Sequence, residues 1–214
     1  MFSYLKHLAK HSLNYSIAQI LTKALGFLLI PLYTRFLLPS DYGIVSTLAA
    51  ITGILGVFYE MGQLGSWQRF YYDYRHDQKE LKEYLGTIII FIFVSVLAYT
   101  IILNLLGDGF FKIFTKEVPF KPYIQIALWT VFFGLFIGFW QRLFQIRQKS
   151  MIFGMISIGQ FLASTLLMIF FVVYLREGAL GMVKAAFFAA LLFFIIAIFG
   201  LRKEIIFKVN ILKL

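Results

Sequence analysis

Long apolar runs separated by short polar segments dominate this chain. A helix needs about 20 apolar residues to cross the hydrocarbon core of a bilayer, and these runs reach that length. Since 61% of the residues are hydrophobic and only 14% are charged, a soluble domain of this size has no way to bury so much apolar surface. The sequence therefore predicts an all-α, polytopic membrane helix bundle. The six expected spans cover residues 13–36, 43–66, 84–106, 122–145, 151–174 and 179–200.

Lysine and arginine residues are unevenly divided between the two sets of connecting segments. With the N-terminus inside the cell, the inner segments hold roughly twice as many of these residues as the outer ones. This bias predicts that both chain ends lie in the cytoplasm. The basic residues occur between apolar runs rather than on one polar domain, so the net charge of +10 favours membrane orientation and excludes nucleic acid as a partner.

Two connecting segments combine aromatic and charged residues in the way that suits the headgroup region. In 67–84 the aromatic residues recur at helical spacing with charges between them, and 108–118 is a shorter candidate on the outer side. We expect both segments to anchor the bundle at the membrane surface. The aromatic residues of the first segment are Trp67, Phe70, Tyr71 and Tyr74.

Charged residues inside the spans are the strongest functional signal from the residues alone. Lys23 in the first span and Glu60 in the second lie at similar depth if these helices are antiparallel. A charge in hydrocarbon is expensive and normally faces a bundle interior or a wet cavity. Lys23 and Glu60 therefore form an ion pair or face a common cavity, and a pair that only locks two helices together is equally compatible. Gln19 shares the face of Lys23.

Polar and small residues on other spans extend this pattern. Arg142 lies near the inner end of the fourth span, Gln160 lies on a polar face of the fifth, and Lys184 opens the sixth. Gly134 and Gly138 form a GxxxG pair, which favours close helix packing. Converging polar faces predict a hydrated cavity, and its mostly positive charges favour an anionic substrate head such as phosphate.

Marks of membrane enzymes are missing from the sequence. It has no HxxxxD, DxD or HExxH motif and no phosphate-binding Walker loop, and it has no cysteine. We therefore expect transport or scaffolding rather than catalysis, with no catalytic residues, no metal site and no cofactor.

Two segments resemble a known family. "KALGFLLIPLYTRFLLPSDYG" (23–43) and "EMGQLGSWQRFYYDY" (60–74) are similar to the N-terminal part of the polysaccharide-transporter, or oligosaccharide flippase, family. That family includes O-antigen flippases and shares a superfamily with lipid II flippases and multidrug exporters. Weaker similarities at 143–159, 177–192 and 202–214 extend the resemblance over nearly the whole chain. The signature residues are Thr34, Pro39, Asp41, Tyr42, Gly43, Gly62 and Arg69.

The resemblance implies a fold, a substrate and partners. Family members have twelve or fourteen helices in two lobes and are about twice as long, so we expect residues 1–214 to be a single N-terminal lobe without its C-terminal lobe. The implied activity is translocation of a polyprenyl-pyrophosphate-linked oligosaccharide across the bacterial inner membrane by alternating access, for O-antigen and lipopolysaccharide synthesis. The implied partners are this lipid, membrane lipids, a second lobe, and polysaccharide polymerases and glycosyltransferases.

Roles for individual residues follow from the charges and the resemblance together. We expect Lys23, Arg35 and Arg142 to attract the pyrophosphate, and Gln19, Glu60 and Gln160 to supply hydrogen bonds. Arg35 also has a structural reading at the corner between the first two helices. There Ser40 can cap the second helix, Asp41 suits the positive end of that helix, and Asp41 can also pair with Arg35 across the turn. A lipid II or drug exporter of the same superfamily, or a non-transporting membrane scaffold of a polysaccharide assembly complex, remains an alternative.

Overall fold

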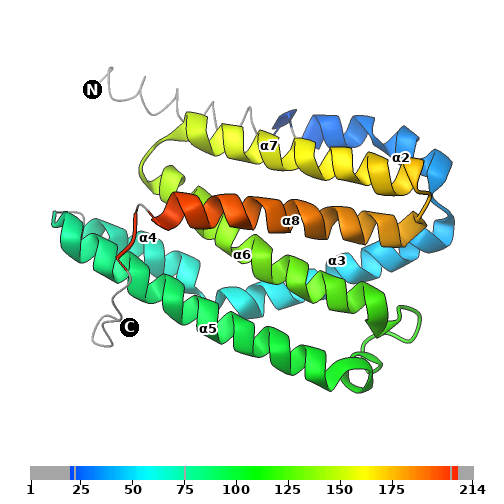
Figure 1. Cartoon of the computed structure of the whole chain (residues 1–214), viewed down its shortest axis with the longest axis horizontal. Helices are drawn as coiled ribbons and strands as arrows, with labels where there is room; N and C mark the ends of the chain where they lie inside the picture. Colours follow the sequence, from blue (N-terminus) through cyan, green and yellow to red (C-terminus); the bar gives the residue numbers. More distant parts are fainter. Residues whose placement is uncertain (1–19, 22, 75, 203, 207–214) are drawn as a thin grey trace. The chain divides into compact units, whose positions relative to one another are not determined.

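The structure, a computed structural model, describes residues 20–21, 23–74, 76–202 and 204–206. These residues form helices and short connections (Figure 1). Five of the helical segments within the described ranges are long and apolar enough to cross a membrane, which confirms the all-α polytopic bundle. The elements are α2 (Ile30–Phe36), α3 (Pro39–Glu60), α4 (Gln63–Tyr74), α5 (Gln78–Phe111), η1 (Phe120–Ile124), α6 (Gln125–Ile146), α7 (Ser150–Met168), η2 (Ile169–Tyr174) and α8 (Gly178–Arg202).

The last three predicted spans agree closely with the helices observed. They correspond to η1 with α6, α7 with η2, and α8, with ends displaced by at most a few residues. The first predicted span, 13–36, lies partly outside the described residues. Its described part is helical on both sides of a turn at Leu29.

The second and third spans need correction. The second was expected to run to residue 66, but α3 ends at Glu60 and α4 begins only at Gln63. The third begins earlier than expected, because the Asp77 carboxylate accepts hydrogen bonds from the backbone N–H groups of Lys79 (2.8 Å) and Glu80 (3.1 Å). This N-cap lets the helix start among polar residues ahead of the apolar run.

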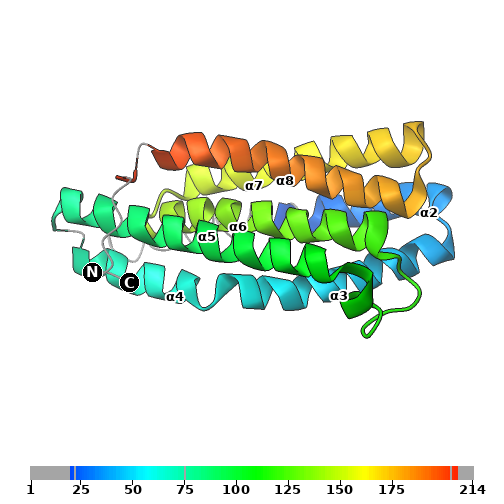
Figure 2. The ribbon, with the colours of Figure 1, turned by 60° about the horizontal axis from the view of Figure 1, so that its bottom comes forward.

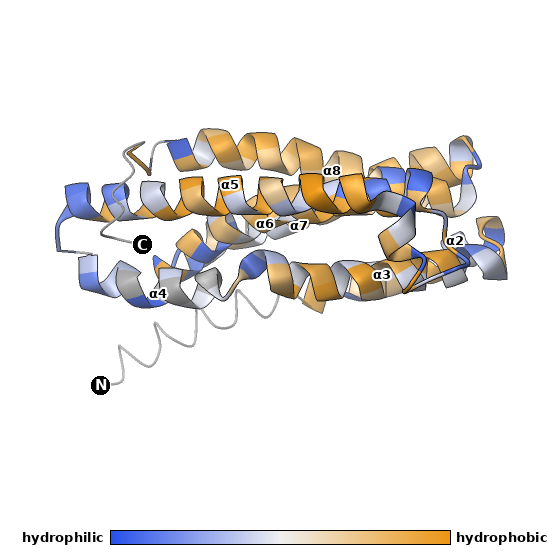
Figure 3. Ribbon diagram, turned by 90° about the horizontal axis from the view of Figure 1, so that it is seen from below, coloured by the Kyte–Doolittle hydropathy of each residue, from blue (hydrophilic) through white to orange (hydrophobic). Residues whose placement is uncertain are grey.

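The hydropathy of α5 changes along the helix. The helix is apolar over its middle and polar at its two ends (Figure 3). The polar C-terminal end of α5 includes Asp108, which pairs with Lys112 at 2.6 Å on the exposed surface. The backbone of α5 is interrupted at Gly107, where φ is 51° and ψ is −136°, so residues 108–111 form a short helical turn beyond a kink. The interfacial role expected for residues 108–118 stays a prediction.

The chain divides into two compact units. The first comprises the described residues within 1–46 and 141–190, and the second those within 47–140 and 191–214. In the first unit, Tyr33 and Leu37 of the α2 region pack with fully buried Val172 of η2. Leu29, Met168 and Met182 complete this small core.

The second unit is held together by aromatic side chains. In it α5 and α6 lie side by side, as Figures 1 and 2 show. Phe93 of α5 lies 5.7 Å from Phe132 and from Phe136 of α6, measured between ring centroids. Phe194 of α8 contacts the same cluster, 5.3 Å from Phe136. Since aromatic pairs at these separations attract beyond their buried area, the cluster fixes three helices against one another.

Candidate functional site

Three of the charged residues predicted to line the substrate pathway are exposed. They are Lys23, Arg35 and Glu60, and none of them has a hydrogen bond or ion pair with another described residue. Lys23 belongs to the first unit and Glu60 to the second, so their proposed pairing stays a prediction. Gln19 lies outside the described residues.

The remaining predicted pathway residues lie in the first unit. Arg142 is half-buried, and its Nη1 donates a hydrogen bond to Gln145 Oε1 on the next turn (3.2 Å). The neighbouring Gln141 amide donates to Ser157 Oγ of α7 (3.4 Å), which joins the end of α6 to α7 by polar groups. Gln160, one turn further along α7, is half-buried. The roles of Arg142 and Gln160 in binding the substrate stay predictions.

Lys184 is engaged in an ion pair. Its Nζ donates to Glu177 Oε1 at 2.8 Å, and it also lies 5.9 Å from the centre of the Phe171 ring. Both partners of the ion pair are about 30% exposed, at 30% for Lys184 and 27% for Glu177. Lys184 is therefore a poor candidate for attracting a substrate anion.

Asp41 of the family signature accepts two backbone hydrogen bonds. Its Oδ2 accepts from the backbone N–H of Leu38 at 2.8 Å, and its Oδ1 accepts from the N–H of Ala179 at 3.0 Å. The first bond is the backward half of a capping box, since Leu38 immediately precedes α3. The second bond provides an acceptor for a backbone N–H group in the first turn of α8, which has no partner within its own helix. One carboxylate thus serves two helix N-termini.

This arrangement corrects the sequence interpretation of the corner. Asp41 was expected at the positive end of the second helix, and its bond to Leu38 confirms that position. It was also expected to pair with Arg35, and Ser40 was expected to cap the helix. The carboxylate is instead used on backbone N–H groups, which lie closer and in fixed directions. Gly178 makes room for it, because its φ is +57° and a Cβ at that position would lie 2.9 Å from Asp41 Oδ1. Gly178 directly precedes the sixth predicted span, 179–200, but nothing in the local sequence connects this glycine to Asp41.

The predicted surface aromatic segment is partly internal. Trp67 is fully buried, and its ring centre lies 4.9 Å from that of Phe139 in α6. The ring centre of Tyr74 lies 5.0 Å from that of Tyr84 in α5. Trp67 therefore packs against other helices rather than anchoring the chain at the headgroups. Helical spacing of aromatic residues marks a packed face as readily as an interfacial one.

The helix break between α3 and α4 is a feature that the sequence analysis missed. Met61 and Gly62 both have left-handed backbone conformations, with φ of +47° and +69°. Just before the break, Tyr59 is buried and its hydroxyl accepts a hydrogen bond from Thr100 (3.0 Å), which lies within the apolar run of α5. The break is therefore at membrane depth.

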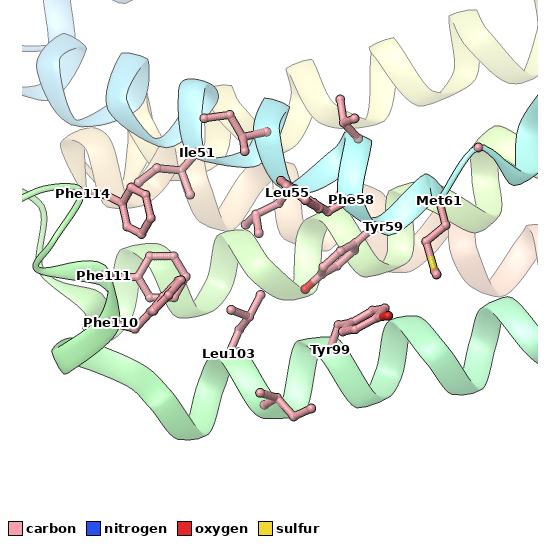
Figure 4. A pocket seen from close by; sticks show the side chains of 14 residues that line it. Ile51, Leu55, Phe58, Tyr59, Met61, Tyr99, Leu103, Phe110, Phe111 and Phe114 are labelled. Atoms are coloured by element: carbon pink, nitrogen blue, oxygen red, sulfur yellow. The ribbon is translucent and has the colours of Figure 1, made fainter.

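A cavity lies beside this break. It has a volume of about 750 Å³, and Met61 and Gly62 form part of its wall. Figure 4 shows Ile51, Leu55 and Phe58 of α3 on one side and Leu103 of α5 on the other. The wall is almost entirely aliphatic and aromatic. The cavity therefore suits an apolar ligand.

The similarity to a known family extends over nearly the whole chain. The family described as polysaccharide biosynthesis protein matches residues 8–214. The chain belongs to this family. No curated protein and no solved structure matches it.

Membership of the polysaccharide biosynthesis family confirms the family prediction made from the two sequence motifs. Together with five apolar helices in the described residues, it supports a multi-pass membrane protein with a flippase or exporter kind of role. Within the described ranges, no group of three or more His, Asp or Glu residues is placed to hold a metal ion.

Proposed function

We propose that the chain is the N-terminal half of a flippase that moves polyprenyl-pyrophosphate-linked oligosaccharide across the bacterial inner membrane. Such a protein would serve surface polysaccharide synthesis, with O-antigen of lipopolysaccharide as the expected product. The observation that carries the proposal is the exposure of two charges in the predicted spans of a chain from a polysaccharide biosynthesis family. These charges are Lys23 and Glu60, which pair with no other residue in the described part of the chain.

Energetics explain why these charges point to a pathway. A charged side chain at the centre of the bilayer costs about 2.5–3.5 kcal/mol on insertion scales. Lys23 and Glu60 would carry this cost twice if both faced lipid. A hydrated cavity or a second lobe removes the cost, because each charge then keeps water or a counter-charge. Lys23, with Arg35 and Arg142, would attract the pyrophosphate, and Gln19, Glu60 and Gln160 would bind the glycan.

The exposed face of α3 supports a second lobe as partner. Ser46, Gly53 and Glu60 recur every seven residues, so they lie on one face of the helix, and all three are exposed. A face that is polar or small at membrane depth is poorly suited to lipid and well suited to a closely packed protein partner. Alternating access would follow from movement of the two lobes around this face.

Export of the lipid-linked glycan tests the proposal. Deleting the gene that encodes this chain should cause lipid-linked oligosaccharide to accumulate on the cytoplasmic side, and a wild-type copy should restore export. A copy with Lys23→Ala should insert normally but leave export at least tenfold lower. Lys112→Ala is the matched control, because Lys112 pairs with Asp108 on the exposed outer surface.

Other outcomes of the same experiment identify the alternatives. Accumulation of peptidoglycan precursor would indicate a lipid II exporter, and drug sensitivity alone would indicate a drug exporter. Wild-type export by the Lys23→Ala protein would refute the role of Lys23. If the deletion strain still exports the lipid-linked oligosaccharide but no longer polymerises the polysaccharide, the non-transporting scaffold is favoured.

A further inference from the structure

The cavity between α3 and α5 offers almost nothing for water to bind. Its polar side-chain groups are the hydroxyls of Tyr59 and Tyr99, and the Tyr59 hydroxyl is already bonded to Thr100. A buried water molecule needs two to four polar partners, so stable filling by water is unfavourable. An empty space of about 750 Å³ is also unfavourable, because its lining atoms lose their dispersion contacts.

Hydrocarbon is the remaining filling. Both walls belong to helices that are long and apolar enough to span a membrane. Several lining side chains are exposed, with Ile54 at 59%, Val57 at 72% and Phe58 at 69%. The cavity is therefore open to the hydrocarbon around the helices. Its volume falls within the roughly 300–1,000 Å³ typical of ligand pockets.

The position of the cavity distinguishes between kinds of lipid tail. An ordinary phospholipid keeps its head at the interface, so its chains need no special site at the break. A lipid whose head is being carried through the membrane has its head at depth, and its tail needs an apolar site beside the pathway. The wall of the cavity includes Met61 and Gly62, which directly follow the pathway candidate Glu60.

We propose that this cavity binds the polyisoprenyl tail of the lipid-linked substrate while the head occupies the pathway beside Glu60. The inference rests on the proposed function for the identity of the substrate. It adds a tail-binding site made by α3 and α5, with the helix break as the junction between the charged pathway and the apolar cavity.

Two lipids with the same head and different tails test this proposal. The probes are a polyisoprenyl monophosphate and dioleoyl phosphatidic acid, both of which carry a phosphomonoester. Binding to the purified full chain in detergent is measured by native mass spectrometry. We expect the polyisoprenyl lipid to bind at least fivefold more tightly. Equal or tighter binding of the phosphatidic acid would overturn the proposal and assign the cavity to phospholipid chains.

Neighbouring residues of α5 provide a matched pair of variants. Ile102 lines the cavity and is 50% exposed, whereas Ile101 does not line it and is 44% exposed. Ile102→Trp should fill the cavity and weaken polyisoprenyl binding at least fivefold, and Ile101→Trp should leave it within twofold of wild type. Val57→Trp, on the α3 wall, provides a second test if Ile102→Trp fails to fold.

The two proposals fail in different ways. Unchanged lipid binding by both cavity variants would refute the tail site, even if the deletion strain accumulates lipid-linked glycan. In the converse case, the purified chain binds the polyisoprenyl lipid selectively, with weaker binding in the cavity variants, while the deletion strain exports glycan normally. That combination would retain the tail site and refute the flippase function.

Discussion

Among single residues, Asp41 shows that the corner motif serves helix capping. Its carboxylate joins the start of α3 to the start of α8 through two backbone N–H groups. The second span was predicted to begin at residue 43 after a turn, whereas α3 already begins at Pro39. Proline and an acidic residue in the first turn are typical of a helix N-terminus. The bond to Ala179 was not predictable, because it joins positions 138 residues apart.

Substitution of Asp41 should therefore affect stability. Asp41→Ala removes acceptors from two helix N-termini and should lower the free energy of unfolding by about 1–3 kcal/mol, on the scale of lost N-caps. Asp41→Asn retains one acceptor oxygen and should cost less. Denaturant unfolding in detergent measures both. Asp41→Ala with wild-type stability would show that the two bonds contribute nothing.

The contact between Asp41 and Gly178 predicts non-additive effects. Gly178→Ala alone should destabilise the protein, because φ is +57° and the new Cβ would lie 2.9 Å from Asp41 Oδ1. Removing the carboxylate with Asp41→Ala removes the steric part of this cost. The double variant should therefore be more stable than the sum of the single effects implies, and a double-mutant cycle measures the difference. Strict additivity would contradict the contact.

At the scale of the helices, hydropathy predicted where spans lie but not where they break. The apolar character around residues 43–66 is continuous enough to predict one span, yet α3 and α4 are separated at Met61 and Gly62. Close helix contacts also differ from the expectation. A Cβ at Gly134 or Gly138 would meet nothing within 4 Å, whereas one at Gly200 would lie 2.6 Å from Trp140 Nε1. Thus the GxxxG pair does not mark the close approach found in the second unit.

Two glycines of the same region isolate the effect of the break. A Cβ added at Gly62 or at Gly65 would meet no atom within 4 Å, but only Gly62 has a positive φ. Gly62→Ala should cost about 1–2 kcal/mol, the penalty of left-handed backbone for an L-residue. Gly65→Ala should stabilise α4 by up to about 1 kcal/mol, because alanine is the better helix former. Thermal unfolding compares the two, and equal effects would contradict the break.

For the molecule as a whole, the charge bias predicts that both ends lie in the cytoplasm. The chain has no cysteine, so a single introduced cysteine reports its own position. Ser40, Lys116 and Gln148 are exposed and suit this test. A membrane-impermeant maleimide should label Ser40→Cys and Lys116→Cys in intact cells, and Gln148→Cys only after permeabilisation. The reverse pattern would invert the topology.

The class of fold, most helix boundaries and the family all followed from the amino-acid sequence. These depend on apolar runs and local motifs, because each segment enters the bilayer mainly according to its own hydropathy. Tertiary structure was needed to show that Asp41 caps α8, that Glu177 engages Lys184, that Trp67 is internal, and that α3 breaks beside an apolar cavity. The first three features depend on contacts between residues that are separated in the chain, and the helix break depends on backbone strain and packing. Local hydropathy contains no information on either.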